Sequence, residues 1–263
     1  MAVRFTTGGV SGGGGTADAL YRSVSFPSTT TVSASFWFYR IGDTNTFADL
    51  LLMRNDGYSA WSLLGMDSDG TTLRHEDANG GTNGLLSVAN TWYHCGLSKS
   101  GANVTVYIDG TSNITRTNAT NPTVTGVTYG GVGNWGQASL GTEIFDGRMA
   151  AMKIWDGVAL TQAELQQEQW FYMPVRTANL WHWNPLLNIV GDFTVDFSGS
   201  GNTFTAGGTL TAEDGPPIAW RMQRSRVWPL AVAAAPGGRT TRNTDPQYLG
   251  VNLGMSRWMR TQP

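Results

Sequence analysis

Short runs in which apolar and polar positions alternate recur along the chain. The clearest pair of runs covers 92–98 and 104–109. A period of two residues predicts strands with one buried face. The intervening sequence KSGAN predicts a hairpin loop between the two strands. We expect the apolar face of the second strand, which consists of Val104, Val106 and Ile108, to point into a core.

Further runs predict strands in 32–43, 47–57 and 59–81, joined by turn sequences such as NDG and DSDG. In the first of these runs the aromatic residues Phe36 and Phe38 lie opposite Trp37 and Tyr39. Residues 112–134 are typical of loops with one short strand. A further alternating strand is expected near 147–156, with Met149, Ala151 and Lys153 on one face and Ala150, Met152 and Ile154 on the other.

One helix is predicted at 162–172. Thr161 and Glu164 form the capping-box pattern, in which each side chain bonds the backbone N–H of the other residue. The helical run stops before Pro174. Strands every 8–12 residues around a single helix predict an all-β sandwich or jelly roll.

Composition supports this fold class and limits the setting. Glycine contributes 34 of 263 residues and only 14% are charged, as expected for a β protein with many turns. Cys95, the single cysteine, lies in a strand and is expected to be a buried apolar residue. No apolar run is long enough for a membrane span or a secretory signal, so we expect synthesis in the cytoplasm and no membrane partner.

Charge is distributed unevenly. Residues 1–218 contain ten Lys and Arg and eighteen Asp and Glu, a net charge of −8. Residues 219–263 contain seven Arg and one Asp, a net charge of +6. An acidic body followed by a basic tail predicts that the tail has an interaction of its own.

The order of these elements resembles the laminin G-like branch of the concanavalin A-like lectin/glucanase superfamily over roughly residues 3–210. The resemblance implies a jelly-roll sandwich of two antiparallel sheets, which we assign to residues 1–215, followed by an extended C-terminal arm at 216–263. The residues that carry it are Trp92, Tyr93, His94, Tyr107, Asp109, Gly110, Gly147, Leu160, Thr161 and Glu164.

Catalysis is not expected. Glucanases of this superfamily place two carboxylates on one strand face with the spacing Glu-x-Asp-x-x-Glu, and this spacing does not occur here. Glu143 and Asp146 are three apart and would point to opposite faces of a strand, whereas a retaining glycosidase needs two carboxylates about 5 Å apart. His75–Asp77 is interpreted as a polar strand end or loop.

No cofactor is expected. The sequence DSDG at Asp67–Gly70 begins like a calcium-binding loop but lacks the later ligands, so we interpret it as a turn. Some laminin G-like domains bind Ca²⁺ at the rim of the sandwich. The resemblance therefore allows Ca²⁺ binding here but assigns no ligand residue.

Tryptophans supply the binding candidates. Trp37, Trp92 and Trp155 fall in predicted strands and are assigned to the core. Trp135 falls in the glycine-rich sequence GGVGNWGQ, where an exposed ring could stack on a sugar or could instead plug the end of the sandwich. Trp135 is therefore the candidate glycan-binding residue.

The C-terminal arm interleaves Arg with Trp and Met, a composition typical of protein interfaces. Its lack of Lys, its prolines and the acidic body argue against nucleic acid. We expect the arm to dock on a neighbouring subunit, and the alternative is that it folds back on its own sandwich. The docking candidates are Trp220, Arg221, Arg224, Arg226, Trp228, Arg257 and Trp258.

The function expected from the sequence is that of a non-enzymatic structural virion protein, most simply a capsid decoration or tail-associated subunit of a bacteriophage. Lysis would release such a protein without a secretory signal. Its partners would be other virion subunits and further copies of itself. The alternative is a glycan-binding adhesin or receptor-binding protein that recognises surface glycans.

Overall fold

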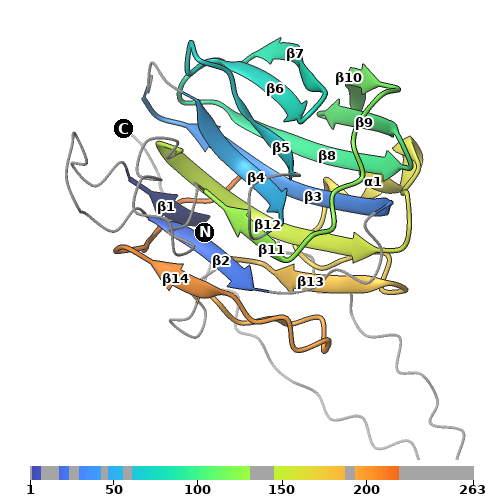
Figure 1. The fold of residues 1–263 in the computed structure, drawn as a ribbon. Helices are drawn as coiled ribbons and strands as arrows, with labels where there is room; N and C mark the ends of the chain where they lie inside the picture. Colours follow the sequence, from blue (N-terminus) through green and yellow to red (C-terminus); the bar gives the residue numbers. More distant parts are fainter. Residues whose placement is uncertain are drawn as a thin grey trace, which may run out of the picture. The chain divides into compact units, whose positions relative to one another are not determined.

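The computed structural model describes residues 2–6, 18–23, 30–42, 47–55, 61–130, 145–186 and 193–218. Within these residues two antiparallel sheets enclose an apolar core, and one short helix packs beside them (Figure 1). The predicted all-β jelly-roll fold is confirmed. No helix of the described residues is long and apolar enough to cross a membrane.

Each sheet joins strands that are far apart in the sequence. Sheet A runs in the order β10 (Thr111–Arg116), β9 (Asn103–Ile108), β8 (Trp92–Ser100), β3 (Thr31–Arg40), β12 (Gly147–Asp156), β1 (Ala2–Phe5) and β15 (Thr211–Glu213), with β13 (Leu180–Asn184) also paired to β12. Sheet B runs in the order β14 (Thr205–Gly207), β2 (Ala19–Ser23), β11 (Gly126–Tyr129), β4 (Ala48–Arg54), β5 (Trp61–Met66), β6 (Thr72–Asp77) and β7 (Gly80–Leu86).

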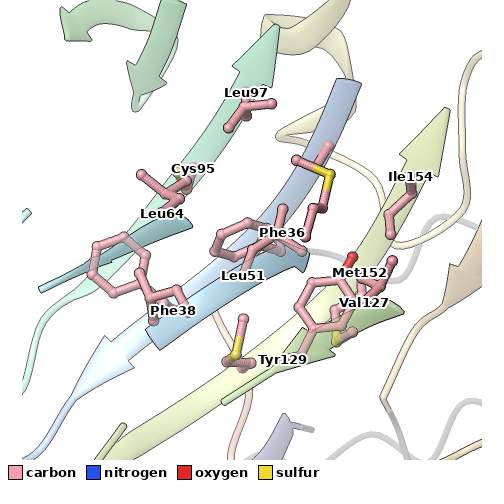
Figure 2. Packing of buried hydrophobic residues seen from close by; sticks show 14 of the residues in the cluster. Phe36, Phe38, Leu51, Leu64, Cys95, Leu97, Val127, Tyr129, Met152 and Ile154 are labelled. Carbon is pink, nitrogen blue, oxygen red and sulfur yellow. The ribbon is translucent and has the colours of Figure 1, made fainter. Parts of the chain in front are cut away.

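The predicted hairpin is β8 and β9, and its apolar face lies in the core as expected. Cys95 pairs with Ile108 and Leu97 pairs with Val106 across the two strands. All four side chains belong to the main core cluster. Figure 2 shows Cys95 and Leu97 on the same side of the sheet as Phe36 and Phe38. Burial raises the pKa of the Cys95 thiol, so this residue is an unreactive part of the core.

The predicted alternation in β12 holds on each side of a bulge at Ala151 but not across it. The pairing register with β3 shifts between Ala150 and Lys153, and Ala151 has a positive φ of 53°. This bulge adds one residue to the strand, so Met149 and Met152 both point into the core. Lys153 points to the opposite face of the sheet, where it is buried. β12 can consequently pair with β1 before the bulge and with β13 after it.

The predicted helix begins as expected but ends early. Helix α1 covers Gln162–Glu168, and both hydrogen bonds of the capping box at Thr161 are present. The buried carboxylate of Glu168 accepts from the backbone N–H groups of Val175 and Arg176, and it also pairs with Lys153 at 2.7 Å. These contacts turn the chain back toward the helix, and for this reason the helix does not continue to 172.

Two polar sequences, one similar to a calcium-binding loop and one similar to an acid–base site, have structural roles. Asp69 accepts hydrogen bonds from the backbone of Thr71 and Thr72, which confirms the turn at Asp67–Gly70. His75 and Asp77 lie at the end of β6, which confirms the interpretation as a strand end, and both side chains are buried. Arg116 pairs with Asp77 at 3.1 Å and contacts His75.

Residues 112–130 hold two strands, β10 and β11, where one was expected.

Candidate functional site

A row of side chains crosses five adjacent strands on the outer face of sheet A. The pairing register places Trp92 of β8 opposite Tyr39 of β3, Tyr39 opposite Arg148 of β12, Arg148 opposite Arg4 of β1, and Arg4 opposite Thr211 of β15. The next residues along these strands, including Tyr93, Phe38, Met149 and Phe5, contact the main core. Because successive side chains of a strand point to opposite faces, the row points away from that core.

The first three members of the row form a ladder of planar groups. The rings of Trp92 and Tyr39 have centroids 5.2 Å apart, tilted by 50°. The guanidinium of Arg148 lies 4.8 Å from the centroid of the Tyr39 ring, within the range of a cation–π contact. The Tyr39 hydroxyl donates to Asn90 Oδ1 at 3.2 Å. The three planar groups are therefore held side by side while each stays half-buried.

Carboxylates hold the arginines of the row in place. Glu213 pairs with Arg148 at 2.5 Å and lies 3.8 Å from Arg4, whose guanidinium also pairs with Asp146 at 2.5 Å. Two arginines thus share two carboxylates, and the charges of this group balance. Asp214 follows Glu213 and is exposed. Paired guanidinium and carboxylate groups still have free donors and acceptors toward solvent.

A hollow opens beside the charged end of the row. Its volume is about 400 Å³, and its lining includes Arg148, Ala212, Glu213 and Asp214. This volume is within the range of small-molecule sites in proteins. We refer to Trp92, Tyr39, Arg148, Arg4 and Glu213, together with this hollow, as the platform.

A second apolar cluster lies beside the platform and supports it. Trp37, Ala150 and Tyr172 pack together on the same outer face, and Trp92 packs against them. Trp37 Nε1 donates to the backbone carbonyl of Gln169, which attaches the chain after α1 to the sheet. Trp92 is consequently held by its neighbours while it stays partly accessible to solvent, a setting that favours contact with a ligand.

The assignment of Trp37 and Trp155 to the core is confirmed, whereas that of Trp92 needs correction. Trp37 and Trp155 are buried, but on the outer face of sheet A, where the chain at 158–172 covers them. Trp92 is only half-buried and belongs to the platform. The sequence did place Trp37 and Tyr39 opposite Phe36 and Phe38, and this signal indicated a second aromatic face.

The candidate residues chosen from the sequence lie outside the described residues. This holds for Trp135 and for Glu143. It holds equally for the arm residues Trp220, Arg221, Arg224, Arg226, Trp228, Arg257 and Trp258. The described chain contains no group of three His, Cys, Asp or Glu side chains that could hold a metal ion.

Sequence reasoning did not find the platform. Tyr39, Arg148, Arg4 and Glu213 are up to 209 positions apart and meet only through strand pairing. The order of strands in a sandwich is not readable from a single sequence, so no local pattern could have predicted this row.

Comparison with known proteins agrees with the fold. A model of the concanavalin A-like lectin/glucanases superfamily, laminin G type, matches residues 12–166. No curated protein matches the sequence. A candidate carbohydrate-binding protein from Bacteroides ovatus has a similar structure, with 17% identity and a TM-score of 0.56 over 84% of this chain, which spans 61% of that protein. A heptameric SAP-like pentraxin from Limulus polyphemus has 15% identity and a TM-score of 0.55, over 80% of this chain and 93% of the pentraxin.

At these identities the solved structures show a shared fold and nothing more. The family match, by contrast, covers more than half of the chain and agrees with the two antiparallel sheets and the capped helix. The chain therefore belongs to the concanavalin A-like lectin/glucanase superfamily, in its laminin G-like branch.

Proposed function

We propose that this chain is a lectin-like module that binds neutral oligosaccharides on the platform. The observation that carries the proposal is the row Trp92–Tyr39–Arg148, which ends at a hollow lined by Glu213 and Asp214. A sugar has an apolar C–H face and a rim of hydroxyl groups. An aromatic ring matches the face, and paired guanidinium and carboxylate groups match the hydroxyls.

Charge favours a neutral ligand. Arg4 and Arg148 are balanced by Asp146 and Glu213, and Asp214 adds a negative charge to the hollow. An acidic sugar would meet repulsion from these carboxylates and would compete with them for the arginines. The similar protein from Bacteroides ovatus is described as a candidate carbohydrate-binding protein, which is consistent with a carbohydrate ligand and does not bear on its charge.

The proposal does not include catalysis. Glu213 and the neighbouring Asp146 are both engaged by arginines. Turnover of glycans by the full chain would contradict this part of the proposal.

The Arg148→Ala variant tests the binding site. We expect it to bind neutral oligosaccharides on a glycan array at least about tenfold more weakly, because loss of a charged hydrogen-bonding group costs roughly 1.5–3 kcal/mol. Glu213→Gln should weaken binding in the same direction. Trp170→Ala serves as the matched control, because Trp170 is exposed but lies outside the platform.

Circular dichroism and melting temperature check that each variant is folded. Unchanged glycan binding by Arg148→Ala and Glu213→Gln, or equal loss in Trp170→Ala, would contradict the platform as the site. A preference of the full chain for sialylated or uronic glycans would contradict the neutral class.

A structural role in a virion is the second candidate function. We propose that the chain is a capsid decoration or tail-associated subunit, and the observation that favours this is the charge of +6 on residues 219–263 against −8 on the rest. Opposite charges on two parts of one chain favour ordered association between copies. This proposal and glycan binding are compatible, because an adhesin can itself be part of a particle.

Density-gradient purification of particles from the source of this chain tests the second role. We expect the full chain to sediment with assembled particles at a constant ratio to their major protein. Recovery of the chain only in the unassembled fraction would contradict the virion role and leave the platform proposal unaffected.

A further inference from the structure

We propose that the platform binds an internal stretch of an extended, β-1,4-linked neutral glycan that lies across the strands of sheet A. This inference rests on the function proposed above and names the class of glycan. Its basis is the spacing of the platform groups. The ring centroids of Trp92 and Tyr39 are 5.2 Å apart, and the Arg148 guanidinium lies 4.8 Å from the Tyr39 centroid.

The spacing of these groups follows from the sheet. Each of them comes from a different strand, and neighbouring strands lie about 4.8 Å apart. A pyranose unit in an extended glycan advances the chain by a similar length. Each strand can therefore meet one sugar unit. Trp92 and Tyr39 contact ring faces, while the arginines donate to hydroxyl groups.

A buried second row closes one flank of the platform. Two positions further along their strands, Trp37 follows Tyr39, Ala150 follows Arg148 and Ala2 follows Arg4 on the same outer face. These three residues are buried in a cluster with Tyr172, and Ile218 packs against it. A bound glycan cannot extend along the strands in this direction, so its long axis follows the platform across them.

The opposite flank is polar. Asn90 Oδ1 accepts from the Tyr39 hydroxyl at 3.2 Å, and Asp146 pairs with Arg4. Asn90 is exposed and Asp146 is half-buried, so both can also contact a ligand. A glycan on the platform thus lies between an apolar border and a polar one, which suits the amphipathic units of a neutral sugar chain.

Both ends of the platform are open within the described residues. Strand β9 ends at Ile108, which pairs with Cys95, so no described strand pairs with β8 on the far side of Trp92. At the other end Thr211 is exposed, and its strand β15 is the outermost of sheet A. A row that is open at both ends accepts the interior of a glycan, whereas recognition of a chain end needs a closed pocket.

A straight row selects the type of linkage. In β-1,4-linked glucans, xylans and chitin, both linkage bonds of each ring are equatorial, and successive rings form a flat ribbon. In α-1,4-linked glucans one bond is axial, and the chain curves into a helix. Only the ribbon stays in contact with Trp92, Tyr39 and Arg148 at the same time and continues toward Arg4.

Isothermal titration calorimetry of the full chain tests the proposal. The probes are β-1,4-linked oligomers of glucose, xylose and N-acetylglucosamine with increasing length up to the hexasaccharide. For at least one series we expect the affinity to rise at least about tenfold from the disaccharide to the tetrasaccharide, because two further units gain contacts. The rise should end once the glycan spans the five strands of the row.

Two controls isolate the extended shape and the internal binding mode. The α-1,4-linked glucose hexasaccharide has the same units as its β-1,4-linked counterpart, and it should bind at least about tenfold more weakly than the best β-1,4-linked hexasaccharide. Reduction of the terminal unit of that hexasaccharide to an open alditol should change its affinity by less than about twofold, because the chain end lies outside the row.

Three results would overturn the proposal while Arg148→Ala still weakens binding. They are a disaccharide that binds as tightly as the hexasaccharide, equal binding of the α-1,4-linked control, and a loss of about tenfold or more on reduction of the chain end. Binding restricted to neutral glycans of other linkages would overturn it as well. Absence of binding by every neutral glycan on the array would instead contradict the function proposed above, and this inference with it.

Discussion

The free energy of unfolding should fall steeply as the pH is lowered from about 6.5 toward 4. All three histidines of the chain are buried and neutral. Burial lowers the pKa of His75 to about 4, with the nearby charge of Arg116 adding to the effect. Burial likewise lowers the pKa of His94 to about 3, beside Lys153, and that of His182 to about 4, although Asp196 opposes the latter shift.

The sign of the effect follows from proton uptake. Between pH 6.5 and 4 the unfolded chain protonates its histidines, whereas the folded chain does not, so stability rises with pH. The stabilisation is fully present above the unfolded value of about 6.5 and is lost as the pH falls toward the folded values. Each histidine accounts for roughly 3–5 kcal/mol. Three of them together approach the whole stability of an ordinary domain, about 5–15 kcal/mol.

Urea unfolding at a series of pH values between 7.5 and 4.5 measures this effect. We expect a slope of up to about 4 kcal/mol per pH unit, because three protons are taken up. His94→Gln removes one of the three groups and should reduce the slope by about a third. A free energy of unfolding that stays constant between pH 7 and 5 would contradict the neutral, buried state of these histidines.

The Lys153→Met variant should lose about 3–5 kcal/mol of stability, the usual cost of removing one partner of a buried ion pair. Lys153 and Glu168 are almost completely inaccessible, with exposed side-chain fractions of 0% and 1%. Lys153 also donates to the carbonyls of Glu168 and Phe171. Its loss leaves the carboxylate of Glu168 buried without a cation and frees the chain after α1.

Arg176→Ala is the control for Lys153→Met. Arg176 pairs with Glu164 at 2.8 Å, but both side chains are about one third exposed, so the loss should be below about 1 kcal/mol. The double variant Lys153→Met/Glu168→Gln removes the isolated charge and should recover part of the loss. Thermal and urea unfolding measure all three. A cost for Lys153→Met equal to that of Arg176→Ala would contradict the structural role of the pair.

Local patterns in the sequence predicted local structure well. The hairpin of β8 and β9 was readable from the alternation at Val104, Val106 and Ile108, and the start of α1 was readable from Thr161 and Glu164. Both signals involve residues that are neighbours in the chain. Two local features were not predicted. One is the bulge at Ala151, where an extra residue shifts the strand register, and the other is the end of α1 at Glu168, where the ion pair with Lys153 holds the chain.

The platform was not predictable for a different reason. Trp92, Tyr39 and Arg148 come from three strands whose adjacency depends on the whole topology of sheet A. The sequence indicated which aromatic residues share a face, but not which strands lie side by side. The docking candidates in 219–263 rest on composition and charge, and they remain predictions.

Binding of a neutral oligosaccharide at Trp92 is the central claim, and the NMR signal of its indole N–H tests it most directly. The probe is a neutral oligosaccharide selected on the array and titrated into the full chain, with indole signals assigned by single Trp→Phe substitutions. We predict that the chemical shift of the Trp92 indole N–H changes with sugar concentration until the site is saturated. The chemical shift of buried Trp155 should stay unchanged. A shift of Trp135 with an unchanged Trp92, or no shift of any indole signal, would contradict the platform as the binding site.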